Sequence, residues 1–270
     1  MNNYFSPCKI LLIIILLFTF SNTVYSQNKD ITLVFKEQRN ELNSLYHLVI
    51  NSNKSHWKEI TTPDIDENKL QNIEYISTEN YTKKEVYKDF NTKLVYSNYD
   101  ILHHNFYVKD KMEPFNWVLL DSTETILNYQ CQIAKTKFRG RTYLVSFTKD
   151  IAISNGPWKF QGLPGLILKV VNIDDSYENF KMECIEILHN SEKVNIEQPF
   201  QIFLIKHNKK LLSWNDFVHK IDVFLKNHIK NIKSSDSSKG EGRYTIKLKL
   251  RHYKEIFNKE VQTEGIIIEM

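Results

Sequence analysis

Few residues of this 270-residue chain combine the types and spacing that chemistry requires. His103 and His104 form its one adjacent histidine pair, but neighbours on a strand point to opposite faces, so sharing a metal ion would need a bulge. Asp64 and Asp66 suit a calcium loop, yet the further spaced ligands that such a loop needs do not follow. We therefore predict neither a metal site nor a cofactor.

Catalytic motifs are equally sparse. The sequence contains no HExxH, CxxC, GxSxG or glycine-rich phosphate loop. Cys131 is the candidate nucleophile, although it lies in a strand-like segment where a buried structural thiol is the more common outcome. Residues distant in sequence can still converge in space, so a secreted hydrolase stays open as an alternative and no catalytic residue is assigned.

Arg139 and Arg141 flank Gly140 and are the best candidates for a polar binding contact, because a guanidinium group binds carboxylate or phosphate with two hydrogen bonds. The alternative is that one of them pairs with a carboxylate of the same chain, such as Asp150 or Glu124. Large aromatic side chains supply the candidate apolar contacts of a binding site: Trp158, Phe160, Trp214, Phe217 and Phe224.

The first 26 residues predict a secretory signal peptide, with an apolar run over 10–20 and cleavage after Ser26. That run is too short to cross a bilayer, so no transmembrane anchor is expected after cleavage. Residues 27–270 then form a single β-rich domain, exported to the periplasm, the outer-membrane periphery or the medium. Export makes nucleic acid an unexpected partner.

Two cysteines, Cys131 and Cys184, remain after cleavage, each in a strand-like segment (128–135 and 180–188). An oxidising compartment permits a disulfide between them if their strands are adjacent. Two buried thiols that behave as small apolar residues are the equal alternative. The sequence leaves both open.

The formal net charge of +4 is too small to indicate a polyanion partner for the whole chain. Charge is uneven, however, because Lys206–Lys259 holds 14 Lys or Arg residues and five Asp or Glu residues. This basic segment suits an anionic membrane surface or an acidic partner, and an ordinary solvated face is the alternative.

Strand signals dominate the chain. Short apolar or alternating runs separated by polar turns predict an antiparallel meander. Residues 53–91 show no pattern that predicts a strand or a helix. The predicted strands are 31–35, 45–50, 92–99, 101–108, 117–120, 126–134, 141–148, 166–172, 180–188 and 245–250.

One segment has helical periodicity. Apolar residues recur at helical intervals over 213–230, with Ser213 as N-cap and Asp216 three positions later. We expect this amphipathic helix to pack on the sheet, with a membrane-surface helix as the alternative. A flexible loop is expected over 234–242, where Ser, Gly and Lys are frequent.

Backbone-shaping residues concentrate in 156–170, GPWKFQGLPGLILKV. Leu163-Pro164-Gly165-Leu166 fits a type II turn, in which Gly165 would take a positive φ. Leu166, Ile167 and Leu168 are apolar without alternation, so both faces of that strand should be covered, and the helix over 213–230 is the expected cover.

The region 129–170 closely resembles the signature region of the GLPGLI family of exported Bacteroidetes proteins, and Leu45–Trp57 and 117–130 also look like that family. The motif residues are Gly156, Pro157, Gly162, Leu163, Pro164, Gly165, Leu166 and Ile167. The family is largely uncharacterised, so the resemblance implies export and an envelope role and carries over no catalytic residue.

These observations predict a mainly β fold, a curved, half-open-barrel-like antiparallel sheet with a C-terminal amphipathic helix packed on it. The motif offers no reactive side chain, so we expect a non-catalytic binding or accessory protein of the cell envelope. Its aromatic-lined concavity would hold a hydrophobic small molecule or a partner segment. An assembly factor for an outer-membrane transporter is a further alternative to the secreted hydrolase.

Overall fold

The computed structural model describes residues 30–39, 42–60, 83–101, 104–174, 180–189 and 194–236. Twelve strands account for most of them. They are β1 (Ile31–Arg39), β2 (Leu42–Ile50), β3 (Lys54–Glu59), β4 (Glu85–Asp89), β5 (Leu94–Ile101), β6 (His104–Lys111), β7 (Val118–Ile126), β8 (Tyr129–Phe138), β9 (Arg141–Thr148), β10 (Leu166–Asn172), β11 (Lys181–His189) and β12 (Leu211–Ser213). Two α-helices, α2 (Glu197–His207) and α3 (Trp214–Asp236), and the short 3-10 helix η3 (Asn208–Lys210) follow β11.

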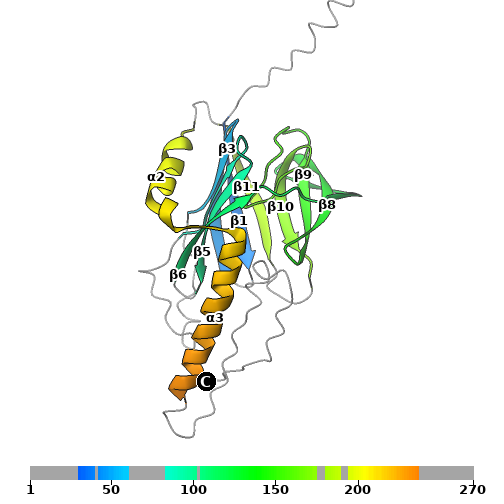
Figure 1. Ribbon diagram of the computed structural model, residues 1–270. Helices are drawn as coiled ribbons and strands as arrows, with labels where there is room; N and C mark the ends of the chain where they lie inside the picture. The colour runs from blue at the N-terminus through cyan, green and yellow to red at the C-terminus, as the bar shows by residue number, and fades with distance from the viewer. Residues whose placement is uncertain are drawn as a thin grey trace, which may run out of the picture.

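All twelve strands belong to one sheet, in the order β12-β6-β5-β4-β3-β2-β1-β11-β10-β9-β8-β7. Every pairing is antiparallel except that of β12 with β6. The sheet does not close, because β7 and β12 lie at its two ends and do not pair with each other. Figure 1 shows β8, β9 and β10 turned away from the group that contains β3, β5 and β6. This confirms the predicted mainly β fold with a curved, half-open sheet.

The two helices cover opposite faces of the sheet near β4–β6. Neighbours on a strand point to opposite faces, and Phe106 contacts Phe217 of α3 whereas Tyr107 contacts Phe203 of α2. The predicted packing of the C-terminal helix on the sheet is therefore confirmed. The helix α2 has no counterpart among the predicted elements.

Several predicted boundaries need correction. Ser213 does cap α3, since its Oγ accepts the Asp216 amide at 3.2 Å, but the helix continues to Asp236. Residues 234–236 are thus helical, and the rest of the predicted loop over 234–242 and the strand over 245–250 lie outside the described residues. The signal peptide over 1–26 lies outside them too.

The prediction about the cover of β10 is wrong. We expected the C-terminal helix to lie over Leu166–Leu168, but α3 packs against β6 and β12, on the other half of the sheet. The segment 149–165 covers β10 instead. Its Phe160 and Leu163 are buried in the same apolar cluster as Leu166–Leu168, and its backbone also accepts from the strand, with the Leu166 amide donating to Ile151 and the Ile167 amide to Asn155.

The predicted type II turn is also wrong. Gly165 does not adopt a positive φ; among the described glycines Gly140 and Gly162 do, and Gly162 has a φ of 92°. What requires glycine at 165 is proximity, because a Cβ there would lie 2.0 Å from the carbonyl oxygen of Thr148. Similarly, a Cβ on Gly156 would lie 2.7 Å from the Cβ of Ile167. Gly165 thus lets two backbone segments come close together, and Gly156 lets the backbone approach the Ile167 side chain.

Candidate functional site

Two of the predicted binding residues, Arg139 and Trp214, meet where separate parts of the chain converge. Arg139 lies in the turn between β8 and β9, and its guanidinium carbon is 3.4 Å from the ring centroid of Trp214, the first residue of α3. The same guanidinium forms an ion pair with Asp110, near the end of β6. Arg139 thus links the β8–β9 turn to the opposite half of the sheet.

Lys159 of the motif joins the same cluster. Its Nζ donates to the hydroxyl of Tyr99 at 2.7 Å and lies 3.9 Å from a carboxylate oxygen of Asp110. The ammonium group is also 4.9 Å from the Trp214 ring and 5.4 Å from the Trp158 ring. Lys159, Arg139 and Asp110 are all nearly fully buried. Buried charges are costly unless they are paired, and Asp110 lies within reach of both cations.

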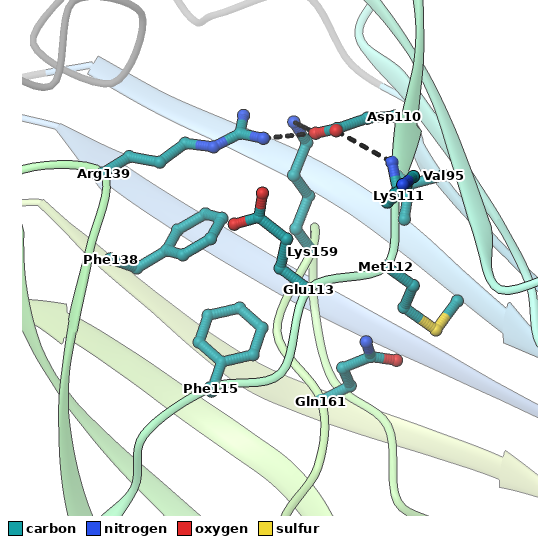
Figure 2. Close-up of a pocket in the computed structure, with 10 residues that line it drawn as sticks. All are labelled: Val95, Asp110, Lys111, Met112, Glu113, Phe115, Phe138, Arg139, Lys159 and Gln161. Atoms are coloured by element: carbon teal, nitrogen blue, oxygen red, sulfur yellow. Dashed lines mark hydrogen bonds and ion pairs between the residues drawn. The ribbon is translucent and has the colours of Figure 1, made fainter. Parts of the chain in front are cut away.

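A small pocket opens beside this cluster (Figure 2). Arg139, Lys159 and Asp110 lie at one side of it, and the rings of Phe115 and Phe138 line another side. Its free volume is about 10 Å³, room for roughly one water molecule. In its present shape the pocket is too small for a hydrophobic ligand.

The remaining predicted binding residues have different surroundings. Phe160 and Phe217 are fully buried in two separate apolar clusters. Phe224 is half-buried, with its ring 4.8 Å from that of His104, and Arg141 is half-buried at the start of β9. The structure brings together Arg139, Trp158 and Trp214 around Lys159. The others are either buried in the apolar clusters or located away from this site.

A buried lysine, which the sequence did not predict, forms hydrogen bonds to the backbone of the motif. Lys88 of β4 has almost no exposed surface, and its Nζ donates to the carbonyl oxygens of Gly156 and Phe160 at 2.8 and 3.0 Å. Burial lowers the pKa of the Lys88 amine to about 7. A neutral amine carries two N–H groups, which match these two carbonyls.

Neither cysteine has the surroundings of a nucleophile. Both are free thiols and both are buried, on β8 and β11, which β9 and β10 separate in the sheet. Burial raises the pKa of Cys131 to about 11 and that of Cys184 to about 12. A thiolate is the reactive form of cysteine, so these thiols are unreactive at neutral pH.

The described ranges contain no metal-ligand cluster and no membrane-spanning helix. No group of three or more His, Cys, Asp or Glu side chains there is arranged to hold a metal ion. His103, Asp64 and Asp66 lie outside those ranges. Of the two α-helices, neither is long and apolar enough to cross a bilayer.

The second candidate site is the outer edge of β7, with which no other described strand pairs. This nine-residue strand pairs with β8 on one side and ends the sheet on the other. Val118 and Leu119 are 60% and 50% exposed. An edge strand presents unpaired N–H and C=O groups, which another extended chain can bind.

No protein-family model and no curated protein matches this sequence. Among solved structures, PNGF-II is similar at 16% identity and a TM-score of 0.42, covering 68% of this chain and 31% of that one. MucB in complex with MucA(peri) has 9% identity and a TM-score of 0.36, covering 62% and 52%. The Pseudomonas aeruginosa MucA/MucB complex has 7% identity and the same TM-score, covering 63% and 54%. A function for this chain must therefore be argued from its own residues.

Proposed function

We propose that this is an exported binding or accessory protein of the cell envelope, of the GLPGLI type that its signature region resembles. In this proposal it holds an extended segment of a partner polypeptide along β7. The observation that carries the proposal is the long outer edge of this strand, which pairs with no other described strand, together with the exposed Val118 and Leu119. Export is supported by the predicted signal peptide.

The hairpin geometry identifies the groups that would bind. Leu127 and Asn128 form a two-residue turn with φ values of 49° and 67°, flanked by the pair Ile126 and Tyr129. In such a hairpin the flanking pair exchanges hydrogen bonds, and the next residue on each strand points its backbone groups outward. The N–H and C=O groups of Thr123 and Thr125 therefore face away from β8.

The side chains of β7 indicate the chemistry of the partner. Its two charged residues, Asp121 and Glu124, are both acidic, and Glu124 is bound to Lys169 at 2.7 Å. The exposed Asp121 favours a basic residue opposite, while Val118 and Leu119 favour apolar ones. The partner is thus an extended segment that combines apolar and basic side chains.

A register shift between Leu119 and Thr123 adds selectivity. An irregularity of this kind bends the strand and increases its twist. A flat strand cannot follow that path along its whole length, so indiscriminate pairing is disfavoured. A partner segment must bend at the same place.

The alternative within this functional class is a hydrophobic ligand held in the aromatic concavity. The interior side of the sheet is filled by the protein's own large side chains, and the pocket near Arg139 has room for about one water. A partner segment on the edge needs no such space. This favours the edge over the concavity.

The test uses synthetic eight-residue peptides that alternate valine with lysine, measured by fluorescence anisotropy. We expect binding, with slower hydrogen exchange at the Thr123 and Thr125 amides, and weaker binding of peptides that carry glutamate in place of lysine. Thr125→Pro removes an outward N–H without removing a bond to β8. It should weaken binding up to about tenfold, because one hydrogen bond, worth about 0.5–1.5 kcal/mol, is lost.

Thr125→Val is the matched control, since it keeps the N–H and should bind as the wild type does. Binding that Thr125→Pro leaves unchanged would contradict the proposed edge. Native mass spectrometry that finds a lipid bound to the protein from its own envelope would instead support the hydrophobic-ligand alternative.

A further inference from the structure

The helix α2 carries apolar side chains on two faces, which is unusual for a surface helix. Its inner face packs Phe200 and Phe203 against the sheet, where their rings contact Tyr87. Its outer face exposes Ile202 and Ile205, at 56% and 81%. Ile205 is the most exposed large apolar side chain among the described residues.

Lysines adjoin this outer face. Ile202, Ile205 and Lys206 lie three and four residues apart, the spacing of one side of an α-helix, and Lys209 and Lys210 follow in η3. Lys206, Lys209 and the adjoining Lys210 are all exposed. We call this set of residues the α2 patch: Ile202, Ile205, Lys206, Lys209 and Lys210.

The carboxylates near α2 are engaged elsewhere. Glu197, in the first turn of the helix, forms an ion pair with Lys54 at 2.8 Å. Glu85, on the sheet below, pairs with Lys58 at 3.1 Å. The α2 patch itself contains no acidic residue, so its charge is uniformly positive.

We propose that the α2 patch binds the surface of an anionic lipid bilayer, with the two isoleucines entering the headgroup region and the three lysines meeting the lipid charges. Protruding apolar side chains flanked by lysines suit the boundary between headgroups and acyl chains, where long lysine side chains keep their charge in water. An acidic protein surface would satisfy the lysines and leave Ile205 without an apolar contact.

The position of the α2 patch in the fold is compatible with partner binding. It lies near β4–β6, whereas β7 ends the sheet on the far side of β3, β2, β1, β11, β10, β9 and β8. Figure 1 shows α2 on the opposite side of the molecule from β8 and β9. A protein bound through α2 would therefore keep its β7 edge free.

The test is flotation of the full chain with vesicles of phosphatidylcholine alone or with 30% phosphatidylglycerol. We expect binding to the anionic vesicles at low salt, weakening as salt rises. Replacing Lys206, Lys209 and Lys210 by Gln should weaken binding on the order of 100-fold, because each lysine near an anionic surface contributes roughly fivefold to the affinity. Ile202→Ser with Ile205→Ser should weaken it at least about tenfold.

The matched control replaces Lys220, Lys226 and Lys230 of α3 by Gln, which changes the net charge equally at another surface. This control should bind the anionic vesicles as the wild type does. Equal loss in both triple variants, unchanged binding after the isoleucine substitutions, or no wild-type binding to anionic vesicles would overturn the proposal. So would salt-sensitive binding to soluble polyglutamate that equals or exceeds vesicle binding.

Discussion

At the β12 end of the sheet, the last strand has three residues and helices cover both faces of the neighbouring strands, α2 on one and α3 on the other. At the β7 end, the last strand has nine residues and the segment 149–165 covers the nearby strand β10 with turns. Both arrangements bury apolar strands. They differ in how far the buried contacts depend on specific residues that no other residue type can replace.

Helical cover spreads its contacts over many apolar side chains, each of which can be replaced by another of similar size. The cover of β10 depends instead on the close approach of Gly165 to the Thr148 backbone and of Gly156 to the Ile167 side chain, and on two hydrogen bonds from Lys88. The end covered by turns should therefore tolerate substitution less than the helical end. Three variants test this difference.

The largest expected effect belongs to Gly165→Ala. The new Cβ would lie 2.0 Å from the Thr148 carbonyl oxygen, so the backbone of β9 or of the motif must move. We expect a loss of about 3 kcal/mol in the free energy of unfolding, measured by urea denaturation.

Gly162→Ala is the comparison within the same loop. It strains a positive φ, but the nearest atom to the new Cβ is 3.4 Å away, so its cost should be about 1 kcal/mol. Equal costs for the two alanines would contradict the view that the close approach to Thr148 makes Gly165→Ala the more costly substitution.

The intermediate effect is that of Lys88→Met, and it depends on pH. In the folded protein the pKa of Lys88 is about 7, and in the unfolded chain it is about 10.4. Between these values the unfolded chain binds the extra proton, so wild-type stability gains up to about 1.4 kcal/mol per pH unit as pH rises. The methionine variant lacks this gain.

The difference in unfolding free energy between the wild type and Lys88→Met should therefore increase from pH 7 to pH 9. At pH 9 it should reach about 2 kcal/mol, because two buried carbonyls lose their donor. Lys149→Met, which removes an exposed lysine near the same loop, is the control and should keep the wild-type pH profile. A pH-independent difference for Lys88→Met would mean that the buried amine does not titrate in this range.

The smallest effect is expected at the helical end. Ser213→Ala removes the hydroxyl that accepts the Asp216 amide at the start of α3, at a cost of about 1 kcal/mol. Ser213→Thr keeps an acceptor and should cost less. A loss for Ser213→Ala as large as that for Gly165→Ala would remove the distinction between the two ends.

Local patterns account for what the sequence predicted well. The strands β9 and β10 have the predicted bounds, because alternating or continuous apolar residues end there at turn-forming residues. Ser213 as the N-cap of α3 was predicted for a similar reason, since a cap is a contact between residues three apart. Such features are decided by neighbours in sequence.

Features that depend on distant residues were missed. Nothing beside Lys88 in the sequence marks it as buried, because its acceptors are 68 and 72 residues away. One of the two arginines, Arg139, does pair with a carboxylate of the same chain, but this carboxylate is Asp110, which was not among the named examples Asp150 and Glu124. The helix α2 escaped notice because apolar residues on both of its faces hide the periodicity of a single stripe.

The two free cysteines would have a consequence for folding if the chain is exported, as proposed, to an oxidising compartment. While the protein is folded, burial keeps Cys131 and Cys184 protonated and out of reach of oxidants. An unfolded chain exposes both thiols at their ordinary reactivity, so a non-native disulfide between Cys131 and Cys184 can form before folding buries them. The fraction of molecules with this disulfide would then increase with the time that they spend unfolded. The refolding yield should therefore depend on the redox buffer, even though the native state contains two thiols.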